Sequence, residues 1–197
     1  MGRSDTGSAT TFTGYYNYMM GFKALRDKVS NNLCQYRDDG ISLKNGILHI
    51  PMRICGSANA TVNMGCVDYI VDIVVRLAES PASVGKTFHI VNPNPPKLGW
   101  LLETSFKIIQ MEGIQIMDTD TLTCEYKNFQ ATKLEERISR ITKQYLDYTC
   151  GEPVFDNRNV KEILGTVPAH PKVDEALIER LLIYAIKVNF GRERPRL

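Results

Sequence analysis

The fold is decided by two stretches, Cys66-Val67-Asp68-Tyr69-Ile70-Val71-Asp72 and Gly85-Lys86-Thr87-Phe88-His89-Ile90-Val91-Asn92-Pro93. The first opens an apolar run over residues 67–78. Its β-branched residues favour a strand, but its length and spacing favour a largely buried helix with Asp68 in the first turn. The second stretch predicts a short, buried parallel strand over Thr87–Val91, followed by a proline-rich loop.

Outward from these stretches, the sequence predicts a succession of strands and helices, which indicates α/β packing. The first fourteen residues are rich in Gly, Ser and Thr and predict a loop. Pro51 places its strand at an edge or at an irregular position. On the helix that is predicted over 132–148, Glu135-Glu136 and Arg137–Arg140 are interpreted as a solvated face. Helices are predicted over 15–29, over 97–111 with an end at Gly113, and over 132–148 and 173–189; strands are predicted over 47–54 and 114–117.

Composition indicates an ordinary globular chain. Its 197 residues predict one domain, or one domain plus a small extension. The net charge of +2 gives little reason to expect a nucleic acid as partner. No apolar run reaches the roughly 18 residues that span a membrane, and the N-terminus lacks the apolar core of a secretory signal. We therefore expect a cytoplasmic protein with no membrane span.

The cysteines and histidines give no support to a metal site or a disulfide framework. The five cysteines are odd in number and none forms a C-x-x-C pair, so we expect reduced thiols, several of them buried. His89 is interpreted as a core histidine inside its apolar strand. His49 and His170 are isolated from other residues at metal-ligand spacing.

Both stretches resemble segments of extended short-chain dehydrogenases/reductases. The first resembles the segment that opens a late helix of the family, with Cys66 where the family usually has proline. The second resembles the last sheet strand, Gly-Lys-x-Phe-His-Leu-x-Asn-Pro. Residues 2–7 are similar to the Gly-x-Ser-x-Thr-Gly loop of the thioester-reductase and fatty-acyl-reductase (male-sterility) branch. Residues 155–159 resemble a downstream Phe-Asp-Asn-x-Asn stretch, so the resemblance runs from residue 1 to about 192.

The resemblance implies the fold and the site residues. The fold would be α/β, an incomplete C-terminal portion of a Rossmann-like extended short-chain reductase with added helices. Residues 1–95 would end the Rossmann-like domain and carry the substrate loop, and residues 96–197 would form a helical, substrate-side subdomain. Asp68 could also be only a helix cap, the tyrosines could simply pack the core, and the N-terminal loop could fray. The substrate-binding candidates are Ser4, Thr6, Gly7, Tyr15, Tyr16 and Asp68.

The parts of the family that perform the reaction have no counterpart in this sequence. No G-x-G-x-x-G turn is present to seat a cofactor pyrophosphate. The catalytic tyrosine of the family is followed by a lysine four residues later, whereas Tyr18 and Lys23 are five residues apart. We therefore assign no catalytic, cofactor-binding or metal-binding residue. NAD(P) is the cofactor of the complete family and not of this chain alone.

Three functions remain open. The first is the substrate-binding portion of an NAD(P)-dependent reductase that acts on an acyl thioester or a related carbonyl, inactive as this chain alone. The second is a fragment of an NDP-sugar epimerase or dehydratase, against which the 2–7 loop argues mildly. The third is a stand-alone, non-catalytic oligomeric binding module. Surface that a nucleotide-binding half would cover predicts a homodimer, with residues 67–91 or 132–148 at its interface.

Overall fold

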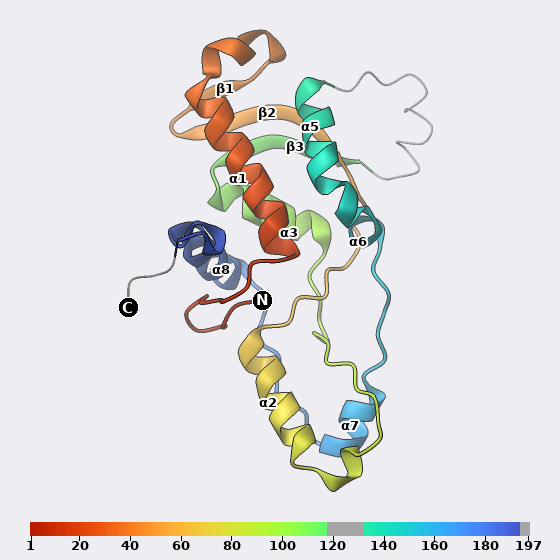
Figure 1. Cartoon of the computed structure of the whole chain (residues 1–197). Coiled ribbons are helices and arrows are strands. Elements are labelled where there is room, and N and C mark those ends of the chain that lie inside the picture. Colours follow the sequence, from red (N-terminus) through yellow and green to blue (C-terminus); the bar gives the residue numbers. More distant parts are fainter. Residues whose placement is uncertain (118–131, 194–197) are drawn as a thin grey trace.

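The computed structural model describes residues 1–117 and 132–193, and it is a mixed α/β structure as predicted. A small sheet lies at one end and a pair of helices, α2 and α7, at the other (Figure 1). Within the described part, no helix is both long and apolar enough to cross a membrane. The α-helices are α1 Tyr15–Asn31, α2 Val67–Ala78, α3 Leu98–Ile108, α5 Lys133–Thr142, α6 Leu146–Cys150, α7 Arg158–Leu164 and α8 Glu175–Lys187; the strands are β1 Ser42–Lys44, β2 Ile47–Cys55 and β3 Met111–Met117.

The sheet has the strand order β1-β2-β3. β1 and β2 form an antiparallel hairpin through Asn45-Gly46, both at positive φ, which suits the twist of a tight hairpin turn. β2 and β3 are parallel, with a register irregularity between His49 and Met52. Pro51 lies in this irregularity, where its missing N–H costs no regular ladder bond, so the predicted irregular position is confirmed.

Gly113 has a different role from the predicted one. The helix that was expected to end there ends at Ile108, and Gln110 follows at a φ of +57°. Gly113 itself lies within β3 at a φ of +85°, facing the irregular part of β2. A Cβ at this position would lie 2.8 Å from the backbone oxygen of Ile50. Glycine is therefore required by the close approach of the two strands and not by the end of a helix.

The main core packs α1, α3 and α8 with the sheet. Tyr18, Met19, Phe22, Leu25 and Val29, which recur at the i, i+3, i+4 spacing of a helix, are all buried in α1, as is Tyr16. The Phe22 ring has no exposed surface and meets the Phe106 ring of α3 edge-on, with 4.9 Å between centroids. Asp174 caps the start of α8, because its carboxylate accepts a bond from the Leu177 amide. The helix buries Leu177, Ile178, Leu181, Leu182 and Ala185.

A second, smaller cluster lies between α2 and α7. Its buried members are Tyr69, Ile73, Leu77 and Val160, and the half-buried Phe88 and Ile90 pack against them. The prediction of a helix over 67–78 is confirmed, but "largely buried" is wrong. One face of α2 is exposed, and 39–52% of the surface of each of its outer residues is open. These outer residues are Val67, Val71, Val74 and Val75.

The predicted strand over Thr87–Val91 is wrong. The segment has no strand partner in the described part of the chain, and without a neighbouring ladder it stays irregular. Side chains bind its backbone instead. The Asn159 side-chain amide donates to the Thr87 carbonyl at 2.8 Å, and the Tyr69 hydroxyl donates to the Val91 carbonyl at 3.3 Å. His89 is accordingly exposed, and its interpretation as a core histidine is also wrong.

The predicted 132–148 helix is present as α5, a short 3₁₀ turn and α6. A capping box starts it, in which Thr132 and Glu135 each accept a bond from the other's backbone amide. The interpretation of Glu135 as part of a solvated face is wrong, because only 6% of its surface is exposed and it pairs with Arg53 of β2. Glu136 and Arg137 are exposed as expected.

Candidate functional site

The N-terminal loop, residues 1–14, folds into a compact turn. The Arg3 amide donates to the Ser8 carbonyl, and the Gly7 amide donates to the Arg3 carbonyl, both at 2.9 Å. Gly7 has a φ of +72°, and a Cβ there would come within 2.3 Å of the Arg180 carbonyl of α8. Glycine at position 7 is therefore required by the close approach of the loop to α8.

Ser4 and Asp68 fasten this loop to α2. The Ser4 amide donates to one carboxylate oxygen of Asp68 at 3.0 Å, and the Ser4 hydroxyl donates to the other. Partial burial would raise the pKa of Asp68, but the two hydrogen bonds from Ser4 outweigh it and lower the pKa. Asp68 is thus an anion at neutral pH, and its own backbone amide also stabilises the carboxylate.

Further bonds hold the loop from the other side. The Met1 ammonium donates to the Gly65 carbonyl at 2.7 Å, and the Gly2 amide donates to the Tyr16 hydroxyl at 3.0 Å. The Arg180 guanidinium donates to the Ser4 carbonyl at 3.1 Å. The loop is therefore tied to α1, α2 and α8 together, whereas the sequence left open whether it would fray.

These ties shape a hollow of about 700 Å³ between the loop, α1 and α2, here called the N-terminal hollow. Among the predicted site residues, Tyr16 and Asp68 line it, while Ser4, Thr6 and Gly7 lie in the loop beside it. Sequence reasoning missed the polar residues that contribute most of its hydrogen-bonding groups, although their loop was singled out. These residues are Arg3, Ser8, Thr10, Thr11 and Thr13.

Tyr15 faces a different place. Its hydroxyl lies 2.6 Å from the Ser105 hydroxyl, which donates in turn to the Leu101 carbonyl at 2.6 Å. Since the Ser105 proton is used in that bond, Tyr15 must be the donor to Ser105. Burial raises the pKa of Tyr15 above its usual range, and burial raises the pKa of Tyr16 to about 12. Both hydroxyls are therefore weak acids, which keep their protons at neutral pH.

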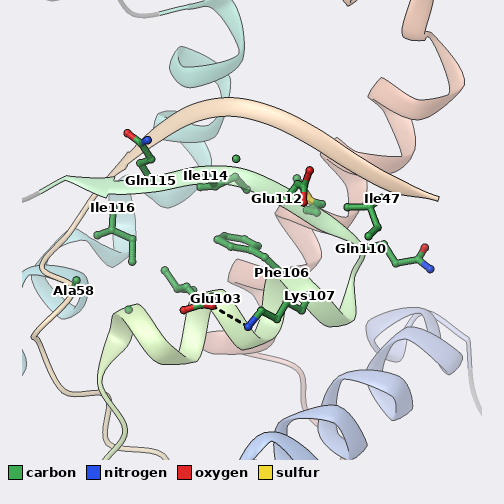
Figure 2. A pocket seen from close by; sticks show the side chains of 14 residues that line it. Ile47, Ala58, Glu103, Phe106, Lys107, Gln110, Glu112, Ile114, Gln115 and Ile116 are labelled. Atoms are coloured by element: carbon green, nitrogen blue, oxygen red, sulfur yellow. Dashed lines mark ion pairs between the residues drawn. The ribbon is translucent and has the colours of Figure 1, made fainter. Parts of the chain in front are cut away.

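A further hollow of about 740 Å³ lies between α3 and β3 and contains none of the predicted site residues. Figure 2 shows Phe106, Ile114 and Ile116 directed into it. Its one drawn ion pair, Glu103 with Lys107 at 2.8 Å, joins two largely exposed groups on adjacent turns of α3. Such a pair contributes little energy and points to no reaction.

In the described part of the chain, the other titratable groups are scattered and are not gathered at either hollow. Among the described residues, no group of three or more His, Cys, Asp or Glu is placed to hold a metal ion. His49 lies 3.5 Å from Glu112, and the His170 ring packs edge-on against Tyr69. Cys34, Cys66 and Cys150 are free thiols, and Cys124 lies outside the described residues.

Comparison with known proteins places the fold. No protein-family model and no curated protein matches the sequence. A similar solved structure is the terminal R domain from the myxalamid PKS-NRPS biosynthetic pathway, with a TM-score of 0.60, 19% identity, and coverage of 98% of this chain and 43% of that one. Another is the thiolation-reductase di-domain of an archaeal non-ribosomal peptide synthetase, with a TM-score of 0.53, 14% identity, and coverage of 98% and 35%.

This chain therefore spans less than half the length of either structure. Identities this low establish the fold and nothing finer. The match over nearly all of the chain agrees with the resemblance of its sequence to the extended short-chain reductases. The chain has the mixed α/β fold of a part of these terminal reductase domains.

Proposed function

We propose that this chain is the substrate-side portion of an NAD(P)-dependent reductase that acts on an acyl thioester or a related carbonyl compound, and that it is not catalytic alone. The observation that carries the proposal is the match of 98% of the chain to a terminal reductase domain more than twice as long. In this proposal residues 1–95 end the Rossmann-like part, residues 96–197 form the substrate-side part, and the protein works in the cytoplasm.

The N-terminal hollow is the proposed place of the substrate's polar end. Serine and threonine hydroxyls and the Arg3 guanidinium can donate hydrogen bonds to a carbonyl or amide oxygen there. Asp68 acts as a positioning residue, because its carboxylate fixes the Ser4 backbone and thereby the loop. Thr6 binds Asp5 and Ser8 within the loop and supports its shape.

The N-terminal loop does not fit a dinucleotide pyrophosphate. A pyrophosphate is normally held by free backbone amides of a glycine-rich turn at a helix N-terminus. Here the Gly2 amide is used by the Tyr16 hydroxyl and the Gly7 amide by the Arg3 carbonyl. No step of a reaction is therefore assigned to a cofactor on this chain.

NADPH binding tests whether the cofactor site lies outside this chain. We expect calorimetric titration of the 197-residue chain to show no binding tighter than about 10 μM, about −7 kcal/mol. Co-expression with the nucleotide-binding half of a terminal reductase domain should give a complex that binds NADPH and oxidises it in the presence of an acyl thioester. Tight NADPH binding by the chain alone would contradict the proposal, as would a purified complex that binds NADPH and leaves every acyl thioester and aldehyde unchanged.

A second candidate function, an oligomeric binding module, is favoured by the exposed valine face of α2. A contiguous apolar patch on a soluble protein usually marks an interaction surface. We expect sedimentation at micromolar concentration to show a homodimer, and Val74→Lys with Val75→Lys to give the 22.3 kDa monomer. Val154→Lys, at a residue that is 96% exposed outside this face, is the control. A monomeric wild-type chain would exclude the oligomeric module.

A further inference from the structure

A separate apolar groove of about 350 Å³ lies between the start of α1, α3 and α6. Leucines of α3 form one side, and the rings of Tyr15 and Tyr18 from α1 form another. None of the described residues that line it carries a charge. The volume lies within the range of about 300–1,000 Å³ of small-molecule sites. Its main lining residues are Tyr15, Tyr18, Val62, Leu98, Leu101 and Tyr148.

Tyr15 and Tyr18 contribute ring carbons to this groove. The Tyr15 hydroxyl donates to Ser105, so the polar end of this side chain is used inside the protein. The Tyr18 ring packs edge-on against Tyr145, with 5.7 Å between centroids, and burial raises the pKa of Tyr18 above its usual range. A ligand in the groove would therefore meet ring and leucine carbons, with no ion to pair with.

The groove and the N-terminal hollow flank the same first turn of α1. Thr13 and Tyr16 line the hollow, whereas Gly14 and Tyr15 line the groove. The Tyr15 and Tyr16 rings are neighbours, with centroids 5.9 Å apart. A Cβ built on Gly14 would meet no atom within 4 Å, so the space beside this glycine is open.

We propose that this groove binds the aliphatic chain of an acyl ligand whose polar end reaches the N-terminal hollow. The proposal rests on the proposed function, to which it adds the class of acyl group. A polar or charged acyl group would be disfavoured, because the surface of the groove is almost entirely apolar and offers few hydrogen-bonding partners in exchange for water. An aliphatic chain gives up no hydrogen bond with water when it enters the groove, and the burial of each methylene stabilises the complex.

A series of acyl chain lengths tests the groove without any cofactor or turnover. The probes are the S-hexanoyl, S-octanoyl and S-decanoyl thioesters of N-acetylcysteamine, titrated calorimetrically into the 197-residue chain. We expect the dissociation constant to fall roughly tenfold for each two methylenes until the groove is full. Equal affinity along the series would overturn the proposal.

Val62→Trp is the blocking variant. Val62 is half-buried at the wall of the groove, and its amide bond to the Pro96 carbonyl, at 2.9 Å, is kept. We expect at least a tenfold weaker binding of the decanoyl probe and the loss of its chain-length dependence. Val84→Trp, at a residue that is 84% exposed, is the matched control and should bind like the wild type.

Tyr148→Ala is the second variant, since Tyr148 is exposed and its removal should leave the fold intact. It takes away one wall of the groove and should also weaken binding of the decanoyl probe. Unchanged decanoyl binding in both groove variants would refute the assignment, as would a Val62→Trp variant that changes only the oligomeric state, because a protein surface would then occupy the groove. Chain-length-dependent binding without reductase activity in the complex would leave the groove standing and refute the proposed reaction alone.

Discussion

Replacing Phe22 with alanine is expected to lower the free energy of unfolding by about 3–5 kcal/mol, as for other large-to-small changes at fully buried aromatic positions. Phe22 has no exposed surface, and its ring contacts Phe106 of α3 and Tyr18 of α1, with centroids 4.9 and 5.2 Å apart. A domain of this size is stable by only about 5–15 kcal/mol, so the loss is a large share of the total.

The reason for so large an effect is the position of the ring between α1 and α3. Its removal takes away carbon contacts to both helices at once and leaves a cavity that neither helix can close without moving. Urea unfolding followed by circular dichroism measures the change. The control is Phe155→Ala, at a phenylalanine with 44% of its surface exposed, which should cost less than about 1 kcal/mol. Equal costs for the two variants would contradict this account of the core.

The elements that could be predicted from sequence are the helices in which apolar residues recur on one face. α1 and α8 bury most of the residues that their helical spacing selects. Composition predicted that residues 1–14 form a loop, whereas their role as a candidate site came only from the resemblance to a reductase loop. Its compact form depends on contacts of Ser4 with Asp68 and of Gly7 with Arg180, which are distant in sequence and follow no periodic pattern.

The failures also have physical reasons. An apolar pentapeptide such as Thr87–Val91 predicts a strand only where a partner strand is available to accept its backbone bonds. Gly113 was interpreted as a helix end because glycine is common there, whereas the structure requires glycine because two strands approach closely. The tyrosine-lined groove is assembled from four separate segments, so no single stretch of sequence indicates it.

Glu135 shows that the burial of a charged residue could not be predicted from local sequence either. Glu135 and Glu136 are adjacent glutamates on one helix, yet Glu136 is exposed and Glu135 is buried against β2. The Glu135 carboxylate accepts bonds from the Arg53 amide at 2.9 Å, from the Arg53 guanidinium at 2.8 and 3.2 Å, and from the Thr132 amide at 2.9 Å. It thus joins α5 to the sheet and caps its own helix.

Replacing Glu135 with glutamine is expected to cost about 3 kcal/mol, the lower end of the range for breaking a buried ion pair, because the Arg53 side chain keeps some access to water. The guanidinium would lose its bonds to the Glu135 carboxylate, and an amide oxygen cannot accept all the bonds that a carboxylate accepts. Glu136→Gln, one residue away on the exposed face, removes the same charge and should change stability by less than about 0.5 kcal/mol.

The pH dependence of unfolding separates the ion pair from mere packing. Burial would raise the pKa of Glu135, but the bonds from Arg53 and Thr132 lower it below its ordinary value of 4.5. A carboxyl with a lowered folded-state pKa contributes its full stabilisation above the unfolded pKa, and this contribution disappears as the pH falls through the folded pKa. The wild type should therefore lose stability below about pH 4.5. The Glu135→Gln variant should lose less over the same range, and the Glu136→Gln variant should follow the wild type. If the Glu135→Gln and wild-type curves stay parallel down through this range, the carboxylate of Glu135 is not the group that holds α5 on the sheet.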